Sequence, residues 1–120
     1  MARVLIVDDE PLLCEELAEC LELEGFDVCQ EHSVPAAMNA LSDGTFDAVI
    51  TDLRMPRIGG LDFIRLMNER QYAGVIIVLS GHGAEKSRQE ALSNGARACL
   101  AKPVDVDDVL ETLERHLSAQ

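Results

Sequence analysis

Long apolar stretches are absent from this chain of 120 residues. A membrane-spanning helix needs roughly 20 consecutive apolar residues, and no run in the chain approaches that length. The first seven residues also lack the charged and then apolar layout of a secretory signal. We therefore expect the chain to stay in the cytoplasm and to have no membrane partner.

Basic residues are scarce as well. Ten Lys and Arg stand against 22 Asp and Glu, which gives a formal net charge of −12. Because nucleic-acid phosphates attract Lys and Arg, this balance argues against direct nucleic-acid binding. The charge suits a basic partner, or one that docks through an apolar patch, although solubility alone explains most of it.

Cysteine motifs for metal binding are missing too. Cys14, Cys20, Cys29 and Cys99 form no Cys-x-x-Cys pair and have no His at the spacing of a zinc site. The first two fall at apolar positions of an expected helix, and the other two fall in expected strands. We expect buried, reduced thiols and no disulfide.

Short apolar runs alternate with helical stretches five times along the chain. This alternation indicates a doubly wound α/β fold, in which helices cover both faces of a parallel sheet. Strands are expected at 3–7, 26–30, 47–51, 75–79 and 97–101. Helices are expected at 11–24, from 33 to the turn at 43–44, at 61–70 and 84–93, and after 105. With no linker or repeat in the chain, residues 1–120 are expected to form one domain.

The expected helix at 84–93 differs from the other four. Ala91 and Leu92 are its main apolar residues, so it is only weakly amphipathic. Weak burial predicts an element that can shift its position.

Polar side chains follow four of the apolar runs. Asp8 and Asp9 come after the first run, Asp52 after the third, Ser80 after the fourth and Lys102 after the fifth. The carboxyl ends of parallel strands meet at one edge of the sheet, where open α/β folds bind ligands. Carboxylates crowded together at that edge require a cation. Each motif alone has a plainer explanation, such as a helix cap or a loop acid, so the hypothesis depends on their combination.

Asp52 can act as a nucleophile toward phosphorus and form an acyl phosphate. Mg²⁺ suits such a site, because it prefers oxygen ligands and bridges to phosphate. We expect Asp9 and Asp52 as direct ligands, Asp8 as a ligand either directly or through water, and the backbone carbonyl of Arg54 as a further ligand.

Two other side chains are expected to neutralise and orient the phosphoryl group. Lys102 would pair with Asp52 at rest and with a phosphoryl oxygen afterwards. Ser80 would donate its hydroxyl hydrogen to another phosphoryl oxygen. Phosphoryl transfer needs this kind of positioning and charge neutralisation more than it needs covalent assistance.

The chain resembles the receiver domains of two-component response regulators over essentially all of its length. The motifs that carry the resemblance are Val7-Asp8-Asp9-Glu10, Thr51-Asp52-Leu53-Arg54-Met55-Pro56, Gly60, Leu79-Ser80-Gly81-His82-Gly83, Gly95-Ala96 and Lys102-Pro103. The resemblance implies a (βα)5 flavodoxin-like fold with strand order 2-1-3-4-5. It implies that Asp52 is the phosphoacceptor for a histidine kinase or phosphotransfer protein, that Mg²⁺ is required, and that the bond before Pro103 is cis.

The resemblance also implies a switch, and here the chain departs from the family. Receivers usually carry Tyr or Phe three residues before the lysine, where this chain has Cys99, so we favour a packing role for that residue. Arg54 and His82 lie two residues beyond the phosphoacceptor and the hydroxyl, where family members vary and tune the phosphoryl lifetime. A solvated loop histidine explains His82 equally well. The surface of the fourth helix, fifth strand and fifth helix is expected to change on phosphorylation.

Other functions stay open at this point. A phosphatase that works through an aspartyl phosphate usually has an acid two residues after the nucleophile, where this chain has Arg54. A pseudo-receiver would bind partners without being phosphorylated. The presence of all the acidic residues, together with Ser80 and Lys102, argues against this alternative. The output is equally open: an attached output domain, a separate protein target, or a homodimer that forms on phosphorylation.

Overall fold

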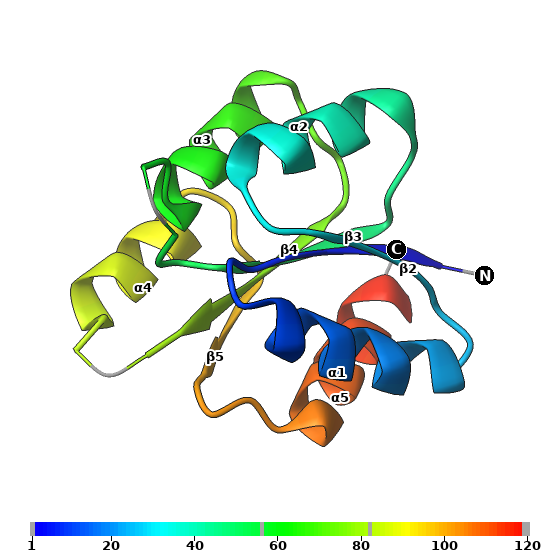
Figure 1. Cartoon of the computed structure of the whole chain (residues 1–120). Helices are drawn as coiled ribbons and strands as arrows, with labels where there is room; N and C mark the ends of the chain where they lie inside the picture. The colour runs from blue at the N-terminus through cyan, green and yellow to red at the C-terminus, as the bar shows by residue number, and fades with distance from the viewer. Residues whose placement is uncertain (1, 56, 82, 119–120) are drawn as a thin grey trace.

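The computed structural model describes residues 2–55, 57–81 and 83–118, apart from the side chain of residue 118. Within these residues five strands alternate with five helices (Figure 1). The strands are β1 (Arg3–Val7), β2 (Asp27–Glu31), β3 (Ala48–Asp52), β4 (Val75–Ser80) and β5 (Ala98–Ala101). The helices are α1 (Pro11–Leu23), α2 (Val34–Asp43), α3 (Gly60–Glu69), α4 (Glu85–Ser93) and α5 (Val106–Ser118).

The strands form one parallel sheet in the order β2-β1-β3-β4-β5, which confirms the predicted fold class and strand order. β1 pairs with two neighbours, so that Leu5 lies opposite Cys29 of β2 and Val49 of β3. The chain therefore starts inside the sheet and winds outward in both directions. This winding places the topological switch point between β1 and β3, where doubly wound folds bind their ligands.

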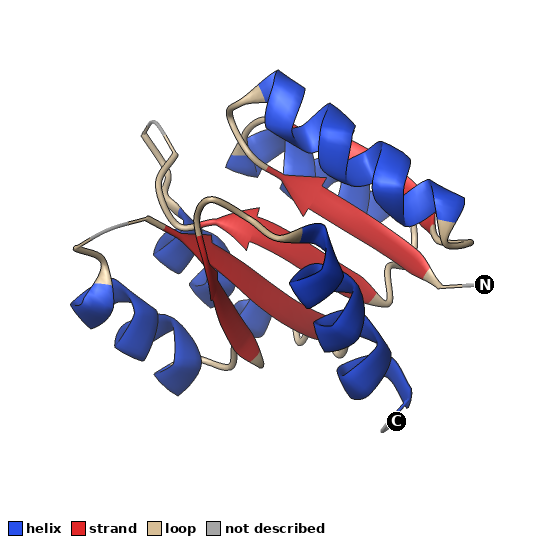
Figure 2. Ribbon diagram, turned by 90° about the horizontal axis from the view of Figure 1, so that it is seen from below, coloured by secondary structure: helices blue, strands red, loops and turns tan. Residues whose placement is uncertain are grey.

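Helices cover both faces of the sheet. α1 and α5 lie on one face, and α2, α3 and α4 lie on the other (Figures 1 and 2). Successive residues of β1 serve opposite faces: Val4 and Ile6 pack with α1 and α5, whereas Leu5 and Val7 pack with α2 and α3. Since both faces are covered, β3 and β4 are buried along their whole length. Burial on both faces explains why these strands appear in the sequence as continuous apolar runs.

Several elements begin or end one residue away from the predicted position. β2 starts at Asp27 rather than at Phe26, because the Phe26 N–H donates to the Leu21 carbonyl at 3.1 Å in the turn that ends α1. β3 starts and ends one residue later than predicted, and β4 ends one residue later, so Asp52 and Ser80 belong to the strands themselves. Strand geometry therefore governs the direction of both side chains.

All four cysteines are free thiols, as predicted, but full burial is correct only for Cys14. Cys29 and Cys99 are half-buried because β2 and β5 are the two edge strands of the sheet. Cys20 is half-buried at the border of the apolar stripe of α1.

The helices differ in how much apolar surface they bury. In α4 only Ala91 is fully buried, and Leu92 is 47% exposed. α3, by contrast, buries Phe63, Ile64 and Met67. α4 is thus the helix held by the fewest buried side chains, as its weak pattern predicted. None of the helices in the described part of the chain is long and apolar enough to cross a membrane.

The buried face of β4 allows a stability test. Ile77 is fully buried between the sheet and the α1–α5 layer. Ile77→Ala should lower the free energy of unfolding by roughly 2–5 kcal/mol, because it removes methyl groups and leaves a cavity. The control is Leu23→Ala, whose side chain is 88% exposed and whose loss should cost less than about 0.5 kcal/mol. Urea titrations would measure both, and equal losses would contradict the packing described above.

Candidate functional site

Strand ends bring the predicted site residues to the carboxyl edge of the sheet. Asp8 follows β1 directly, Asp52 and Ser80 are the last residues of β3 and β4, and Lys102 follows β5. Parallel pairing in register keeps these strand ends level with one another. The structure thus brings together, from distant parts of the sequence, two buried carboxylates, a hydroxyl and an ammonium group.

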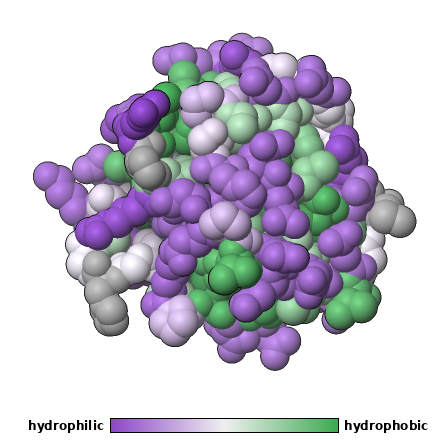
Figure 3. All heavy atoms as spheres, in the orientation of Figure 1, coloured by the Kyte–Doolittle hydropathy of each residue, from purple (hydrophilic) through white to green (hydrophobic). Residues whose placement is uncertain are grey.

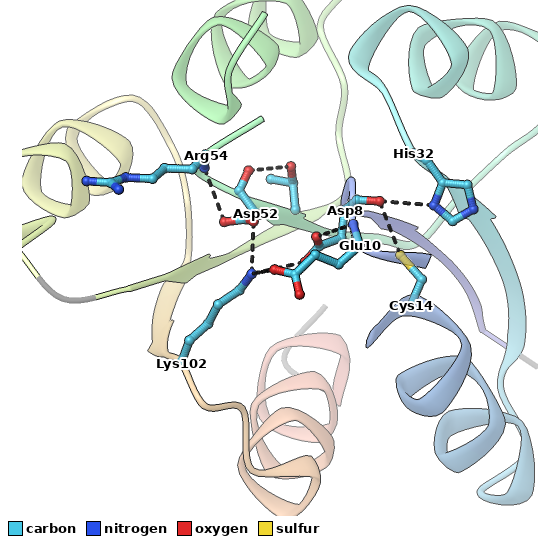
Figure 4. Close-up of polar contacts among 8 residues, drawn as sticks. Asp8, Glu10, Cys14, His32, Asp52, Arg54 and Lys102 are labelled. Atoms are coloured by element: carbon cyan, nitrogen blue, oxygen red, sulfur yellow. Dashed lines mark hydrogen bonds and ion pairs between the residues drawn. The ribbon is translucent and has the colours of Figure 1, made fainter. Parts of the chain in front are cut away.

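Lys102 joins the acidic side chains of this edge (Figure 4). Its Nζ lies 2.9 Å from Oδ2 of Asp52, 3.3 Å from Oδ2 of Asp8 and 3.5 Å from Oε1 of Glu10. Its backbone N–H donates to the Ser80 carbonyl at 2.7 Å, which holds it beside the end of β4. Asp8 is 1% exposed and Asp52 is 5% exposed, so water and salt screen these contacts weakly.

The two buried carboxylates are held in the same way. Oδ1 of Asp8 accepts the backbone N–H of Glu10 at 3.0 Å, and Oδ1 of Asp52 accepts the backbone N–H of Arg54 at 3.1 Å. In each carboxylate the other oxygen, Oδ2, contacts Lys102. Each side chain thus bonds the amide two residues ahead, as Asp does in tight turns. Both carboxylates are consequently fixed in orientation before any ligand arrives.

The backbone of Asp8 has supports of its own. Its carbonyl oxygen accepts from Nδ1 of His32 at 3.0 Å and from Sγ of Cys14 at 3.5 Å. A carbonyl can only accept, so this geometry assigns the proton to Nδ1 of the imidazole. Burial raises the pKa of the Cys14 thiol to about 11, and the nearby Asp8 charge adds to this effect. The thiol is therefore protonated and acts as a donor here.

The charges of the site are unbalanced. Burial raises the pKa of the Asp8 carboxyl, and the charge of Asp52 raises it further, while the Glu10 N–H and Lys102 partly oppose the rise. For Lys102, burial disfavours the charged form, but hydrogen bonds and attraction from Asp52 and Asp8 outweigh it and raise the pKa to about 12. One ammonium group therefore serves several carboxylates, and a further cation would be stabilised beside them.

The donor atoms at this edge fit a divalent cation. Carboxylate oxygens of Asp8, Asp9, Glu10 and Asp52 all lie within 4.8 Å of one another. Such a set of oxygen donors matches the preference of Mg²⁺. A hollow lined by Asp9, Leu53, Arg54 and Met55 opens beside them.

Ser80 has an unusual environment for a buried hydroxyl. The residue is 1% exposed, and its Oγ has no hydrogen-bond partner among the described residues. Buried polar groups are nearly always paired in folded proteins. An unpaired hydroxyl at this edge is therefore a ready donor for a ligand oxygen.

The loop after β3 has one residue with a left-handed backbone, and that residue is not one of its glycines. The left-handed residue is Arg57, with φ of 68°. Gly60 is needed for a different reason, because a Cβ there would overlap the backbone carbonyl of Asp52 and lie 2.7 Å from Cα of Leu53. The start of α3 therefore packs directly on the phosphoacceptor candidate.

The remaining predicted residues lie around this centre or outside the described residues. Cys99 contacts α4 rather than the acidic cluster, since its Sγ donates to the Arg88 carbonyl at 3.8 Å. The Arg54 side chain is exposed and extends away from Asp52 (Figure 4). His82 lies outside the described residues. The peptide bond between Lys102 and Pro103 is cis, as the resemblance implied.

Two contributors were not predicted as site residues. Glu10 adds a fourth carboxylate to the acidic cluster, and His32 supports the Asp8 carbonyl. A signal existed for both: Glu10 directly follows the Asp pair, and His32 directly follows β2 at the same edge of the sheet.

Comparisons with known proteins agree with this geometry. Residues 4–114 match the family model described as the response regulator receiver domain. The chain belongs to this family. It is a receiver domain of the two-component response regulators, and thus a signalling domain.

Known relatives and structures share the receiver fold. FixJ, a transcriptional regulatory protein of Azorhizobium caulinodans, is 36% identical over 102 residues, which cover 85% of this chain and 48% of FixJ. A receiver domain protein from Clostridium thermocellum has a TM-score of 0.94 at 27% identity, covering 99% of this chain and 96% of that one. The beryllofluoride-activated NtrC4 receiver domain dimer has a TM-score of 0.92 at 31% identity, covering 99% and 98% of the two chains.

This receiver domain spans only part of the curated relatives that it matches. It covers about half of the length of FixJ and about a quarter of two other regulators, DctD and FleR from Pseudomonas aeruginosa.

The charge imbalance at Asp8 generates a stability prediction. Burial raises its pKa in the folded state, so the stability it contributes is present at low pH and is lost as the pH rises through the folded-state pKa. Asp8→Asn should therefore raise the Tm of the metal-free receiver at pH 7 by a few degrees, which corresponds to roughly 1 kcal/mol for a chain of this size. This advantage should vanish in acid, where Asp8 itself is protonated.

Thermal unfolding with EDTA and with Mg²⁺ would measure this effect. Mg²⁺ should stabilise the unmodified protein more than the Asp8→Asn variant, since only the folded state assembles the ligands. Asp43→Asn, at an exposed position at the end of α2, is the matched control. It should neither raise the Tm in EDTA nor reduce the stabilisation by Mg²⁺. A lower Tm for Asp8→Asn in EDTA would show that the pairing with Lys102 outweighs the burial of the carboxylate.

Proposed function

We propose that this receiver domain accepts a phosphoryl group on Asp52 from a histidine kinase or a phosphotransfer protein. The observation that carries the proposal is the environment of its carboxylate. One oxygen is bound by the Arg54 amide and the other by Lys102. The hydroxyl of Ser80, at the end of the neighbouring strand, has no hydrogen-bond partner among the residues that the structure describes. These groups would serve as nucleophile, cation and hydrogen-bond donor at one edge of the sheet.

Mg²⁺ is the proposed cofactor of this reaction. Asp9 and Asp52 would bind it directly, Asp8 would bind it directly or through water, and the Arg54 backbone carbonyl would complete the protein ligands. Glu10 supplies a further carboxylate in the same cluster. When bound, the ion neutralises charge between these carboxylates and the phosphoryl oxygens.

The chain's own residues would carry the transfer as follows. An oxygen of Asp52 bonds to phosphorus while the bond from phosphorus to the donor's imidazole nitrogen breaks, and the electron pair stays on that nitrogen. Lys102 moves its contact from the carboxylate to a phosphoryl oxygen, and Ser80 donates its hydroxyl hydrogen to another. The receiver thereby assists its own phosphorylation, and by the same contacts its dephosphorylation.

The output surface of this switch is proposed to be α4, β5 and α5. Ser80 and Lys102 flank the segment that contains α4 and β5, so a change at both positions acts on that segment. Exposed charges of both signs lie on this surface, including Lys86, Glu85 and Glu111. Such a surface suits an attached output domain, a protein target or a second copy of the receiver. Cys99 is proposed to serve packing between β5 and α4.

Docking of the phosphoryl donor is proposed to involve the outer face of α1. Leu12 and Leu23 are 74% and 88% exposed. Figure 3 shows apolar patches over this helix, set among hydrophilic residues. We place the receiver, as one domain over residues 1–120, in the cytoplasm together with its phosphoryl donor.

Incubation with acetyl phosphate and Mg²⁺, followed by intact mass measurement, tests the proposed function. The protein should gain one phosphoryl group per chain. Asp52→Asn and EDTA should each abolish the gain, whereas Asp43→Asn should leave it unchanged. Continuous phosphate release would indicate a phosphatase instead, and no gain at all would indicate a pseudo-receiver.

The same experiment also measures the rate at which the phosphoryl group is lost from Asp52. Arg54 and His82 are proposed to tune its lifetime from the rim of the site. The Arg54→Ala variant should therefore change the rate of decay, because its side chain borders the hollow beside Asp9. An unaltered rate would remove Arg54 from this role.

A further inference from the structure

Two buried polar atoms lack a hydrogen-bond partner in the described part of the chain, and the residues that carry them line one pocket. The atoms are Oγ of Ser80 and Nε of Arg88. The pocket has a volume of about 230 Å³, and Lys102, Glu85 and the backbone of Gly81 and Gly83 also line it. Ser80, whose hydroxyl can both donate and accept, thus lines the same cavity as Arg88, whose Nε–H can only donate.

Arg88 is held only loosely in its present position. Its Nη1 contacts Oε2 of Glu85 at 3.3 Å, one turn earlier on α4. The Glu85 side chain is 74% exposed, and ion pairs of this kind contribute little because water competes for both partners. The guanidinium can therefore exchange Glu85 for a better partner at small cost.

Arg88 belongs to α4 and lines the same pocket as Ser80 and Lys102. Its backbone carbonyl accepts from Sγ of Cys99, so this residue already contacts β5. In the next turn of α4, Ala91 is the helix's one fully buried residue. α4 therefore has few buried side chains that would resist a small movement driven by Arg88.

Phosphorylation would change the charge that this pocket faces. A phosphoryl group carries about −1.5 to −2 units of charge near neutral pH. Among the described residues, Lys102 is the one cation in contact with the buried carboxylates. Arg88 is the other cation that lines the pocket beside Ser80, so added negative charge at Asp52 would attract it.

We propose that Arg88 is a positioning residue that couples α4 to the phosphorylated site through Ser80. Once the Ser80 hydroxyl gives its hydrogen to the phosphoryl group, its oxygen accepts the Nε–H of Arg88, and the guanidinium leaves Glu85. This relay pairs both unpartnered atoms and draws α4 toward the carboxyl edge. The inference rests on the proposed phosphorylation of Asp52.

The direct test is nuclear magnetic resonance of the Arg88 Nε–H group in the whole chain. Beryllofluoride with Mg²⁺ serves as the phosphoryl mimic, and Asp52-dependent shifts in β3 report its binding. On binding, the Nε–H resonance should shift, and its exchange with water should slow about tenfold. Ser80→Ala should abolish this change, because the acceptor is removed.

Variants of Arg88 test the consequence for α4. Arg88→Gln should still gain one phosphoryl group from acetyl phosphate, but the shifts of the α4 amides on activation should fall by at least half. Arg88→Lys keeps the charge without the Nε–H, and it should show the same loss. Arg70→Gln makes the same change as Arg88→Gln at an exposed position at the end of α3 and should respond as the unmodified protein does.

The possible outcomes separate the two proposals. If Asp52 binds the mimic while the Nε–H resonance stays unchanged, or if Arg88→Gln keeps the full α4 response, the role of Arg88 is wrong and the phosphoacceptor site stands. If neither the mimic nor acetyl phosphate loads the unmodified protein, both proposals fall. A supporting result from Glu85→Gln would be a rise of about two- to fivefold in affinity for the mimic, because it frees Arg88 from its competing partner.

Discussion

Lys102 holds together two buried carboxylates that would otherwise repel each other at the carboxyl edge of the sheet. Its Nζ lies within 3.3 Å of both Asp8 and Asp52, although these residues are 44 positions apart in the sequence. The parallel order of the strands creates this proximity, and the amides of Glu10 and Arg54 set the orientation of each carboxylate. Sheet, loops and site are thus parts of one arrangement.

This arrangement sacrifices some stability for reactivity. Asp8 has a raised pKa because burial opposes its charge. The buried hydroxyl of Ser80 has no partner among the described residues, although a buried polar group normally requires one. A bound cation would stabilise the buried charge of Asp8, and a phosphoryl group would give the Ser80 hydroxyl a hydrogen-bond partner. A resting state that is slightly unfavourable in this way is well suited to a switch, since ligand binding then shifts the structure readily.

Much of the fold could be predicted because its strands are buried on both faces and appear as uninterrupted apolar runs. The position of Asp52 after such a run sufficed to place it at the sheet edge. The roles of His32 and Arg88 could not be predicted, because both depend on where a side chain from another element ends in space. The predicted full burial of Cys29 and Cys99 was wrong, because both lie in edge strands. The residues of a strand do not by themselves reveal whether it lies at the edge or in the middle of the sheet.

Reduction of the acyl phosphate with sodium borohydride tests the central claim most directly. Hydride converts a phosphorylated aspartate to homoserine, which peptide mass spectrometry locates in the sequence. After treatment with acetyl phosphate and Mg²⁺, the account predicts homoserine at position 52 and at no other acidic position of the edge. Homoserine at Asp8 or Asp9, or 5-hydroxynorvaline at Glu10, in place of homoserine at position 52 would contradict it. The absence of any reduced residue from a protein that has gained phosphate would contradict it as well.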